Sequence, residues 1–161
     1  MQHYTANWDA TEAQLARAMA DLEAHALALG LSPRNALTLV LMLEELYTNT
    51  LRHGVGASRC IQERNALGNA PPVGTRIRVQ LEILPDGDVA LIYEDDAAPY
   101  DPFQLLHDQQ LASTDLAVED RPVGRLGAVL LARMSDSTSY VYQDDRNRIT
   151  LRLNPNKRAD S

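Results

Sequence analysis

The sequence predicts an α+β fold, with one mixed but mostly antiparallel sheet covered on one face by about three helices. Two helical patterns come first, two hairpin patterns follow, and a third helical pattern separates the hairpins. Helices segregated from hairpin strands in this way are typical of a two-layer α/β sandwich. The 161 residues suffice for one domain with its own core, which we assign to 1–154, leaving 155–161 as a polar tail.

The composition narrows the class of protein. A hydrophobic fraction of 45% and a charged fraction of 23% are those of a globular domain. The net charge of −7 argues against a nucleic-acid partner, which normally requires a basic surface. Cys60 is the only cysteine, which indicates a reducing compartment. No signal-peptide pattern or apolar run of about 20 residues is present, so we expect a cytoplasmic protein without a membrane partner.

The first segments predict a short strand and a helix. Residues 3–8 are interpreted as an edge strand. Apolar residues then return every three or four positions, as from Leu15 to Leu22, which predicts an amphipathic helix over 9–29. Gly30 is placed to terminate that helix.

A second helix follows almost at once. Ser32 is a favourable N-cap residue, and Pro33 suits the first helical position, where its missing N–H costs nothing. The run NALTLVLMLEELYTNTLRH is apolar on most sides, which predicts a helix buried between other elements and ended by Gly54.

Two hairpins and a third helix complete the predicted elements. Alternating apolar residues predict a strand over 75–84, and the PDGD turn returns the chain through a strand at 89–95. Glycines leading into an apolar run predict a helix over 126–134. The last segment predicts strands near 138–143 and 147–153.

Two segments show no regular pattern. Residues 55–73 end in Pro-Pro, and we interpret them as a loop. Residues 103–122 are irregular and polar towards their end, which suits a loop at the edge of a site.

A column of polar residues marks the end of the second helix. Glu45, Asn49 and His53 follow one another at a spacing of four, so they share one helical face. A glutamate can orient or deprotonate a hydroxyl, and an asparagine oxygen suits Mg²⁺. Together they suit the two sides of a phosphoryl-transfer site. The alternative is a solvated stripe, with His53 interacting with the helix dipole.

Two further patterns carry candidate binding residues. Asp95 ends a strand, where it can accept a hydrogen bond from an exocyclic amine such as that of adenine, and small residues at 97 and 98 let a flat ring approach. The alternative is an acidic turn that ends a strand. Gly124 and Gly127 lead into a helix and predict an anion site, although glycines also serve plain loop-to-helix turns.

The order of these three patterns resembles the GHKL, or Bergerat-fold, ATPases. More narrowly, it is similar to the stand-alone anti-sigma-factor serine/threonine kinases of bacteria. The family's N box, E-x-x-x-N-x-x-x-H-G, matches Glu45, Asn49, His53 and Gly54. The resemblance implies that Glu45 is the general base and that Asn49 is a Mg²⁺ ligand.

The same resemblance extends over the two later boxes. The family's D-x-G-x-P-F-D-P box matches Asp95, Pro99, Tyr100, Asp101 and Pro102, which implies that Asp95 binds the adenine amine. The glycine-rich box matches Gly124 and Gly127, and its loop, with Arg125 and Leu126, is implied to face the phosphates. Ala97 stands where the family has glycine, and Arg125 takes the second place of its Gly-Gly pair.

The resemblance implies an ATP- and Mg²⁺-dependent kinase that regulates transcription. Its implied substrate is an anti-anti-sigma partner of the STAS type, with a homodimer and a sigma factor as further expected assemblies. The alternative function is a non-catalytic module, weak in nucleotide binding, that sequesters a regulator by protein–protein contact. The departures at Ala97 and Arg125 favour this alternative. A histidine-kinase ATPase domain is less favoured, because the lid region over 103–122 is short.

Overall fold

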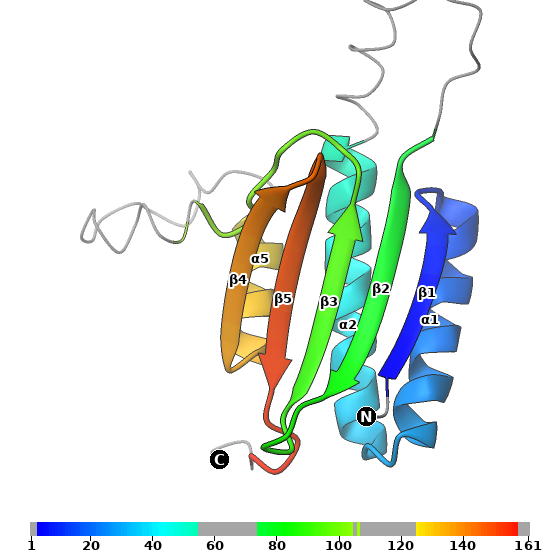
Figure 1. The fold of residues 1–161 in the computed structure, drawn as a ribbon, viewed down its shortest axis with the longest axis vertical. Coiled ribbons are helices and arrows are strands. Elements are labelled where there is room, and N and C mark those ends of the chain that lie inside the picture. The colour runs from blue at the N-terminus through cyan, green and yellow to red at the C-terminus, as the bar shows by residue number, and fades with distance from the viewer. Residues whose placement is uncertain (1–2, 55–73, 105, 107–124, 158–161) are drawn as a thin grey trace, which may run out of the picture.

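A computed structural model describes residues 3–54, 74–104, 106 and 125–157. These residues form two layers, a five-stranded sheet in the order β1-β2-β3-β5-β4 and a layer of helices behind it (Figure 1). The α+β sandwich predicted from the sequence is therefore confirmed. Each pairing among the described strands is antiparallel, so the expected mixed pairing does not occur among them. The strands are β1 His3–Asp9, β2 Arg76–Ile83, β3 Val89–Asp95, β4 Ser137–Gln143 and β5 Arg146–Leu153.

The first helix, α1 (Glu12–Ala28), is shorter than predicted. It begins three residues later than expected because Asp9 still pairs with Arg76 as the last residue of β1. Gly30 terminates the helix as predicted. Its φ of +85° is a left-handed conformation that favours glycine, and it lets the Leu31 N–H reach the Ala26 carbonyl at 3.1 Å.

The second helix, α2 (Pro33–Asn49), has the predicted N-terminal cap, with the Asn35 N–H donating to Ser32 Oγ at 3.2 Å. It ends earlier than predicted. The chain continues as a π-helix, η1 (Thr50–Gly54). Thr50 is the first residue of that wider turn, and its hydroxyl bonds to the sheet. The regular column of the α-helix therefore extends only over Glu45 and Asn49, and the wider turn sets the place of His53.

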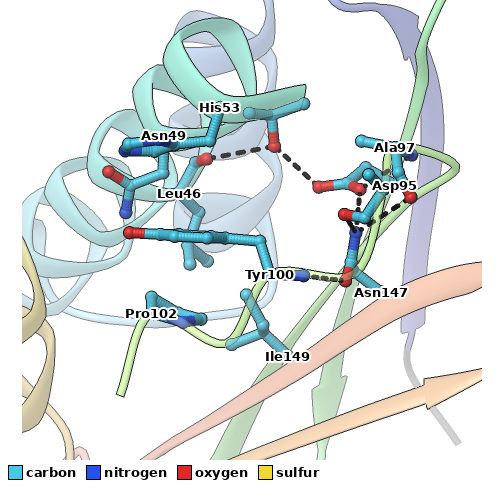
Figure 2. A pocket seen from close by; sticks show the side chains of 11 residues that line it. Leu46, Asn49, His53, Asp95, Ala97, Tyr100, Pro102, Asn147 and Ile149 are labelled. Atoms are coloured by element: carbon cyan, nitrogen blue, oxygen red, sulfur yellow. Dashed lines mark hydrogen bonds between the residues drawn. The ribbon is translucent and has the colours of Figure 1, made fainter. Parts of the chain in front are cut away.

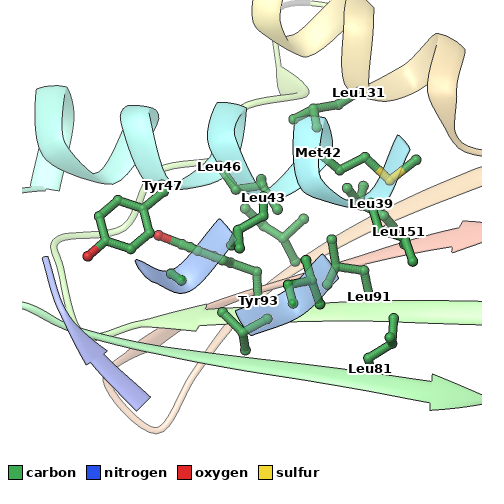
Figure 3. Close-up of a cluster of buried hydrophobic side chains, with 14 of the residues drawn as sticks. Leu39, Met42, Leu43, Leu46, Tyr47, Leu81, Leu91, Tyr93, Leu131 and Leu151 are labelled. Atoms are coloured by element: carbon green, nitrogen blue, oxygen red, sulfur yellow. The ribbon is translucent and has the colours of Figure 1, made fainter. Parts of the chain in front are cut away.

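The core lies between α2 and the sheet, with α5 (Arg125–Met134) on one flank and α1 on the other (Figure 3). On β2, Ile77, Val79 and Leu81 are buried and Ile83 is half-buried, and β3 is buried along its whole length at the centre of the sheet. Each large apolar side chain contributes about 1.5 to 3 kcal/mol of burial free energy. The most prominent core residues are Leu39, Met42, Leu43, Leu46, Tyr47, Leu81, Leu91, Tyr93, Leu131 and Leu151.

One row of residues crosses the sheet at the end of β3. Trp8 pairs with Ile77, Ile77 pairs with Asp95, and Asp95 pairs with Asn147. Ile77, Asp95 and Asn147 are all buried. Trp8 packs against the core, and its indole Nε1 has no hydrogen-bond partner among the described residues. This row brings Asp95 and Asn147 together on neighbouring strands.

Across the part of the chain that the structure describes, no helix combines the length and the apolar character that crossing a bilayer requires.

Candidate nucleotide-binding site

A pocket opens beside the C-terminal end of α2, between η1, the loop that follows β3, and β5 (Figure 2). It encloses about 290 Å³, part of which is open solvent. The lining residues are Leu46, Asn49, Thr50, His53, Asp95, Ala97, Ala98, Tyr100, Pro102, Asn147 and Ile149.

Asp95 is the buried acid of this pocket. Its Oδ1 accepts hydrogen bonds from Asn147 Nδ2 at 2.7 Å and from the Ala97 N–H at 3.1 Å. Its Oδ2 accepts one from Thr50 Oγ1 at 2.7 Å. Because a carboxylate oxygen accepts two hydrogen bonds, Oδ2 can take one further donor from a ligand.

Tyr93 fixes the position of Thr50 through a hydrogen bond between their hydroxyl groups. Its hydroxyl lies 2.7 Å from Thr50 Oγ1. Burial, and then the neighbouring charge of Asp95, raises the pKa of Tyr93 well above its usual value, so the phenol stays a neutral donor. Since the Thr50 proton goes to Asp95, Tyr93 donates to Thr50. The chain of bonds joins η1 to the centre of the sheet.

Asn147, on β5, is one of two polar residues of this pocket that the sequence analysis missed, the other being Thr50. Asn147 is only 2% exposed. Its amide donates to Asp95 Oδ1 and to the carbonyls of residues 97 and 98. Its oxygen accepts from the Tyr100 N–H at 2.9 Å and from the Tyr140 hydroxyl at 2.8 Å. In the sequence Asn147 follows Asp-Asp-Arg. Asparagine is common in such polar turns, so the local sequence gives no sign of a binding role.

An aromatic pair connects η1 to the loop after β3. The rings of His53 and Tyr100 are stacked, with centroids 4.4 Å apart and an interplanar angle of 17°. Figure 2 shows the Tyr100 ring reaching beneath η1 into the pocket. Burial, and then the charge of Asp101, raises the pKa of Tyr100. The pair presents a flat apolar surface near Asp95, suited to a planar ligand.

Asn49 faces the same pocket from the last turn of α2. No described residue forms a hydrogen bond with its carboxamide, so the oxygen is available to a ligand. The described residues contain no group of three or more His, Cys, Asp and Glu able to hold a metal. A Mg²⁺ ion here would therefore rely on Asn49, phosphates and water, a ligand set that Mg²⁺ commonly adopts with nucleotides, so the residues fit that ion.

Glu45 lies beside this pocket and is not part of its lining. Its carboxylate packs against Gly127 in the first turn of α5, so closely that a Cβ atom there would stand under 3.0 Å from Glu45 Oε2. Leu126, the next residue back, is 72% exposed. Arg125 is the first residue of α5, and Gly124 lies outside the described residues.

The predicted residues thus fall into two neighbouring groups. One pocket brings together Asn49, His53, Asp95, Ala97 and Tyr100, which come from two separate segments, 49–53 and 95–100. The second group is the contact between Glu45 and Gly127. Since Glu45 and Asn49 are one turn apart on α2, the two groups adjoin along that helix.

Comparison with solved structures finds the same fold across nearly the whole chain. The RsbU and RsbW domains of Rv1364c from Mycobacterium tuberculosis align with a TM-score of 0.59 at 14% identity, over 95% of this chain and 32% of that one. The SiaB–SiaC complex from Pseudomonas aeruginosa gives a TM-score of 0.54 at 15% identity, over 93% of this chain and 88% of that one. The present chain thus spans about a third of the first protein's chain.

Sequence comparison supplies the family. No curated protein matches the chain. The family model for the histidine kinase-like ATPase domain matches residues 8–153, which include the whole pocket described above. The chain therefore belongs to the histidine kinase-like ATPase domain family.

Proposed function

We propose that this protein is an ATP-dependent serine/threonine kinase of the anti-sigma-factor type. The observation that carries the proposal is the pocket in which a buried Asp95, with one acceptor position left, faces the same space as the Asn49 amide, to which no described residue hydrogen-bonds. The proposed substrate is an anti-anti-sigma protein of the STAS type. The solved neighbours, an RsbW domain and SiaB in complex with SiaC, support a chain that acts on a protein partner.

The proposed nucleotide is ATP. Asp95 Oδ2 accepts a hydrogen bond from the adenine amine, whereas guanine would present a carbonyl oxygen to that acceptor and be repelled. The stacked pair of His53 and Tyr100 flanks the base. The first-turn N–H groups of α5, at Arg125, Leu126 and Gly127, serve the phosphates together with Gly124. Mg²⁺, held by Asn49, would neutralise phosphate charge when bound.

The proposed reaction transfers the γ-phosphoryl group to a serine or threonine hydroxyl. Glu45 accepts the hydroxyl proton as the oxygen forms a bond to the γ-phosphorus. The bond from that phosphorus to the β–γ bridging oxygen breaks, and ADP leaves with the electron pair. The proton passes from Glu45 to water. Positioning and charge neutralisation supply most of the catalysis in such transfers, so few side chains are needed.

A second candidate function is the non-catalytic module that sequesters a regulator by contact. The methyl group of Ala97 favours it, because this buried side chain lines the pocket where the family has glycine. A methyl group narrows the space for the base without closing it, which is why the kinase is preferred. For both the kinase and the non-catalytic module, we propose a cytoplasmic homodimer that also binds a sigma factor.

The test begins with calorimetry of Mg·ATP, Mg·ADP and Mg·GTP binding. The kinase proposal expects ATP and ADP to bind and GTP to bind about 5- to 150-fold more weakly, since a lost amine contact costs about 1 to 3 kcal/mol. Asn49→Ala should weaken binding only when Mg²⁺ is present. The exposed Asn7→Ala on β1 is the matched control and should leave binding unchanged.

Catalysis is then tested with Glu45→Gln. In the kinase, this variant should bind ATP normally while phosphate transfer to the STAS-type partner falls by about 10² to 10⁴. Absence of ATP binding to the wild type at millimolar concentration contradicts the kinase. Binding of the partner without nucleotide, unchanged in Glu45→Gln, would then favour the sequestering module.

A further inference from the structure

We infer that Gly127 is a positioning residue for Glu45, and that the absence of a side chain at this position fixes where the catalytic carboxylate lies. The inference rests on the proposed function. In the proposed function the backbone N–H of Gly127 serves the phosphates. The inference gives this glycine a second role, which is to set the position of the Glu45 carboxylate.

The contact itself is between the side chain of Glu45 and the backbone of α5. Gly127 is buried, and an added Cβ would stand under 3.0 Å from Oε2 and 3.4 Å from Cδ of Glu45. Real Cβ atoms are essentially never that close to another heavy atom. The carboxylate therefore occupies the volume that any other residue at position 127 would need.

Hydrogen bonds do not hold the carboxylate in this place. Within the described part of the chain, no donor bonds to either oxygen of Glu45. Its position is set by packing against the first turn of α5. The first turn of a helix also has N–H groups without a partner inside the helix and carries the positive end of the helix dipole, both of which attract a carboxylate. Position 127 thus controls the distance between Glu45 and the end of α5.

The expected effect of a side chain at this position is on geometry more than on stability. The atom that would have to move is the far end of a flexible glutamate, which rotates away at small cost. The φ of Gly127 is not in the left-handed region, so alanine strains no backbone there. Alanine also has a higher helix propensity than glycine. The fold should therefore tolerate a methyl group that displaces the carboxylate.

The experiment compares Gly127→Ala with Glu45→Asp and with the double variant. Gly127→Ala should keep its thermal unfolding midpoint and bind ATP within about threefold of wild type, whereas kcat for phosphate transfer falls by about 10², as expected for a base misplaced by about 1 Å. Glu45→Asp alone should also lower kcat, because the side chain is one methylene shorter and its carboxylate lies farther from the substrate hydroxyl. Adding Glu45→Asp to Gly127→Ala should raise kcat by about tenfold over Gly127→Ala, since the shorter side chain fits beside the methyl group.

A matched control is Gly74→Ala, because a Cβ on Gly74 meets no atom within 4 Å. It should leave both ATP affinity and kcat unchanged. The inference is overturned if Gly127→Ala transfers phosphate at the wild-type rate, or if it loses ATP affinity while kcat holds, which would assign the glycine to the phosphates alone. A double variant no faster than Gly127→Ala also overturns it.

The failure of the proposed function looks different. In that case the wild type itself transfers no phosphate, and the positioning role falls with it. If Gly127→Ala alone does not fold, the double variant decides: recovery of a cooperative unfolding transition supports the steric conflict with Glu45, and continued loss of folding overturns it.

Discussion

At the scale of single residues, the site depends on how Asn147 orders the groups around Asp95. Its amide saturates Oδ1 of Asp95 together with the Ala97 N–H, which leaves ligand binding to Oδ2. The same amide ties down the loop backbone as far as Tyr100. In the proposed complex Asn147 does not need to touch the base, because it fixes Asp95, the acceptor that would.

We predict that Asn147→Ala destabilises the protein by about 2 to 4 kcal/mol, because five buried or partly buried polar groups lose a partner at once. Urea denaturation checks the value. The variant should also lose selectivity for Mg·ATP over Mg·GTP, measured by calorimetry, as Asp95 becomes free to turn. Asn7→Ala, an exposed asparagine on β1, should change stability by less than about 0.5 kcal/mol. An equally small effect at Asn147 would show that the network is not cooperative.

The residues that were predicted differ physically from those that were missed. Asp95 and Asn49 stand at the ends of strongly patterned elements, so sequence reasoning could single them out as candidates, and both line the pocket. Thr50 and Asn147 act through partners 45 and 52 residues away in sequence, and no local pattern reveals such bonds. Their residue types are also common in turns and helix ends.

At the scale of elements, the sequence predicted the existence of each described helix and strand, and it missed the change from α2 to η1. Residues 48–53 contain neither glycine nor proline, so nothing in the sequence marks the wider turn. The turn coincides with the bonds from Thr50 to Tyr93 and Asp95. Tertiary contact here overrides the local preference for a regular helix.

A second feature at this scale is a set of hydrogen bonds that joins Asp136, between α5 and β4, to the segment after β5. Asp136 accepts hydrogen bonds from Lys157 Nζ at 2.6 Å and from the Asn154 N–H at 2.7 Å. The bond from Lys157, and then that from Asn154, lowers the pKa of Asp136 below its usual 3.8. A carboxyl with a lowered pKa stabilises the fold above the unfolded-state pKa, and this stability is lost as the pH falls through the folded-state pKa.

Asp136→Asn should therefore be less stable than wild type above about pH 5. The difference should shrink as the pH falls below about 4 and vanish only below the lowered folded-state pKa of Asp136. Since the pair with Lys157 is largely exposed, the loss should stay under about 1 kcal/mol. Urea titrations across that pH range measure it. Asp145→Asn, in the exposed β4–β5 turn, is the control and should follow wild type at each pH. A constant difference across the range would contradict the linkage.

At the scale of the whole molecule, the hairpin and helix patterns were enough to predict a sandwich, because burying each apolar face admits few arrangements. The strand order was not predictable in this way. β5 lies between β3 and β4, so the last strand of the chain is inserted into the sheet, and only long-range pairing determines that. For the same reason the contact between Asn147 and Asp95 could not be predicted, since the β3–β5 pairing is what brings the two residues together.

Nucleotide binding should be visible in the stability of the entire domain. At an ATP concentration of about 100 times Kd, mass action adds about 2.7 kcal/mol to the folded state. For a chain of this size, that should raise Tm by about 5 to 10 °C. Thermal unfolding followed by circular dichroism, with Mg·ATP and then Mg·GTP, checks the expectation. Equal shifts with both nucleotides would contradict recognition of the base by Asp95.

The register that aligns Trp8, Ile77 and Asp95 gives the protein an internal spectroscopic probe. Trp8 is the only tryptophan in the chain, and two strand spacings of about 4.8 Å separate its backbone from that of Asp95. An adenine nucleotide carrying a fluorescent group would therefore quench the indole emission by energy transfer when it occupies the pocket. Binding and release can then be followed by stopped-flow fluorescence. The fluorescent group is on the nucleotide, so the protein needs neither a label nor a second tryptophan.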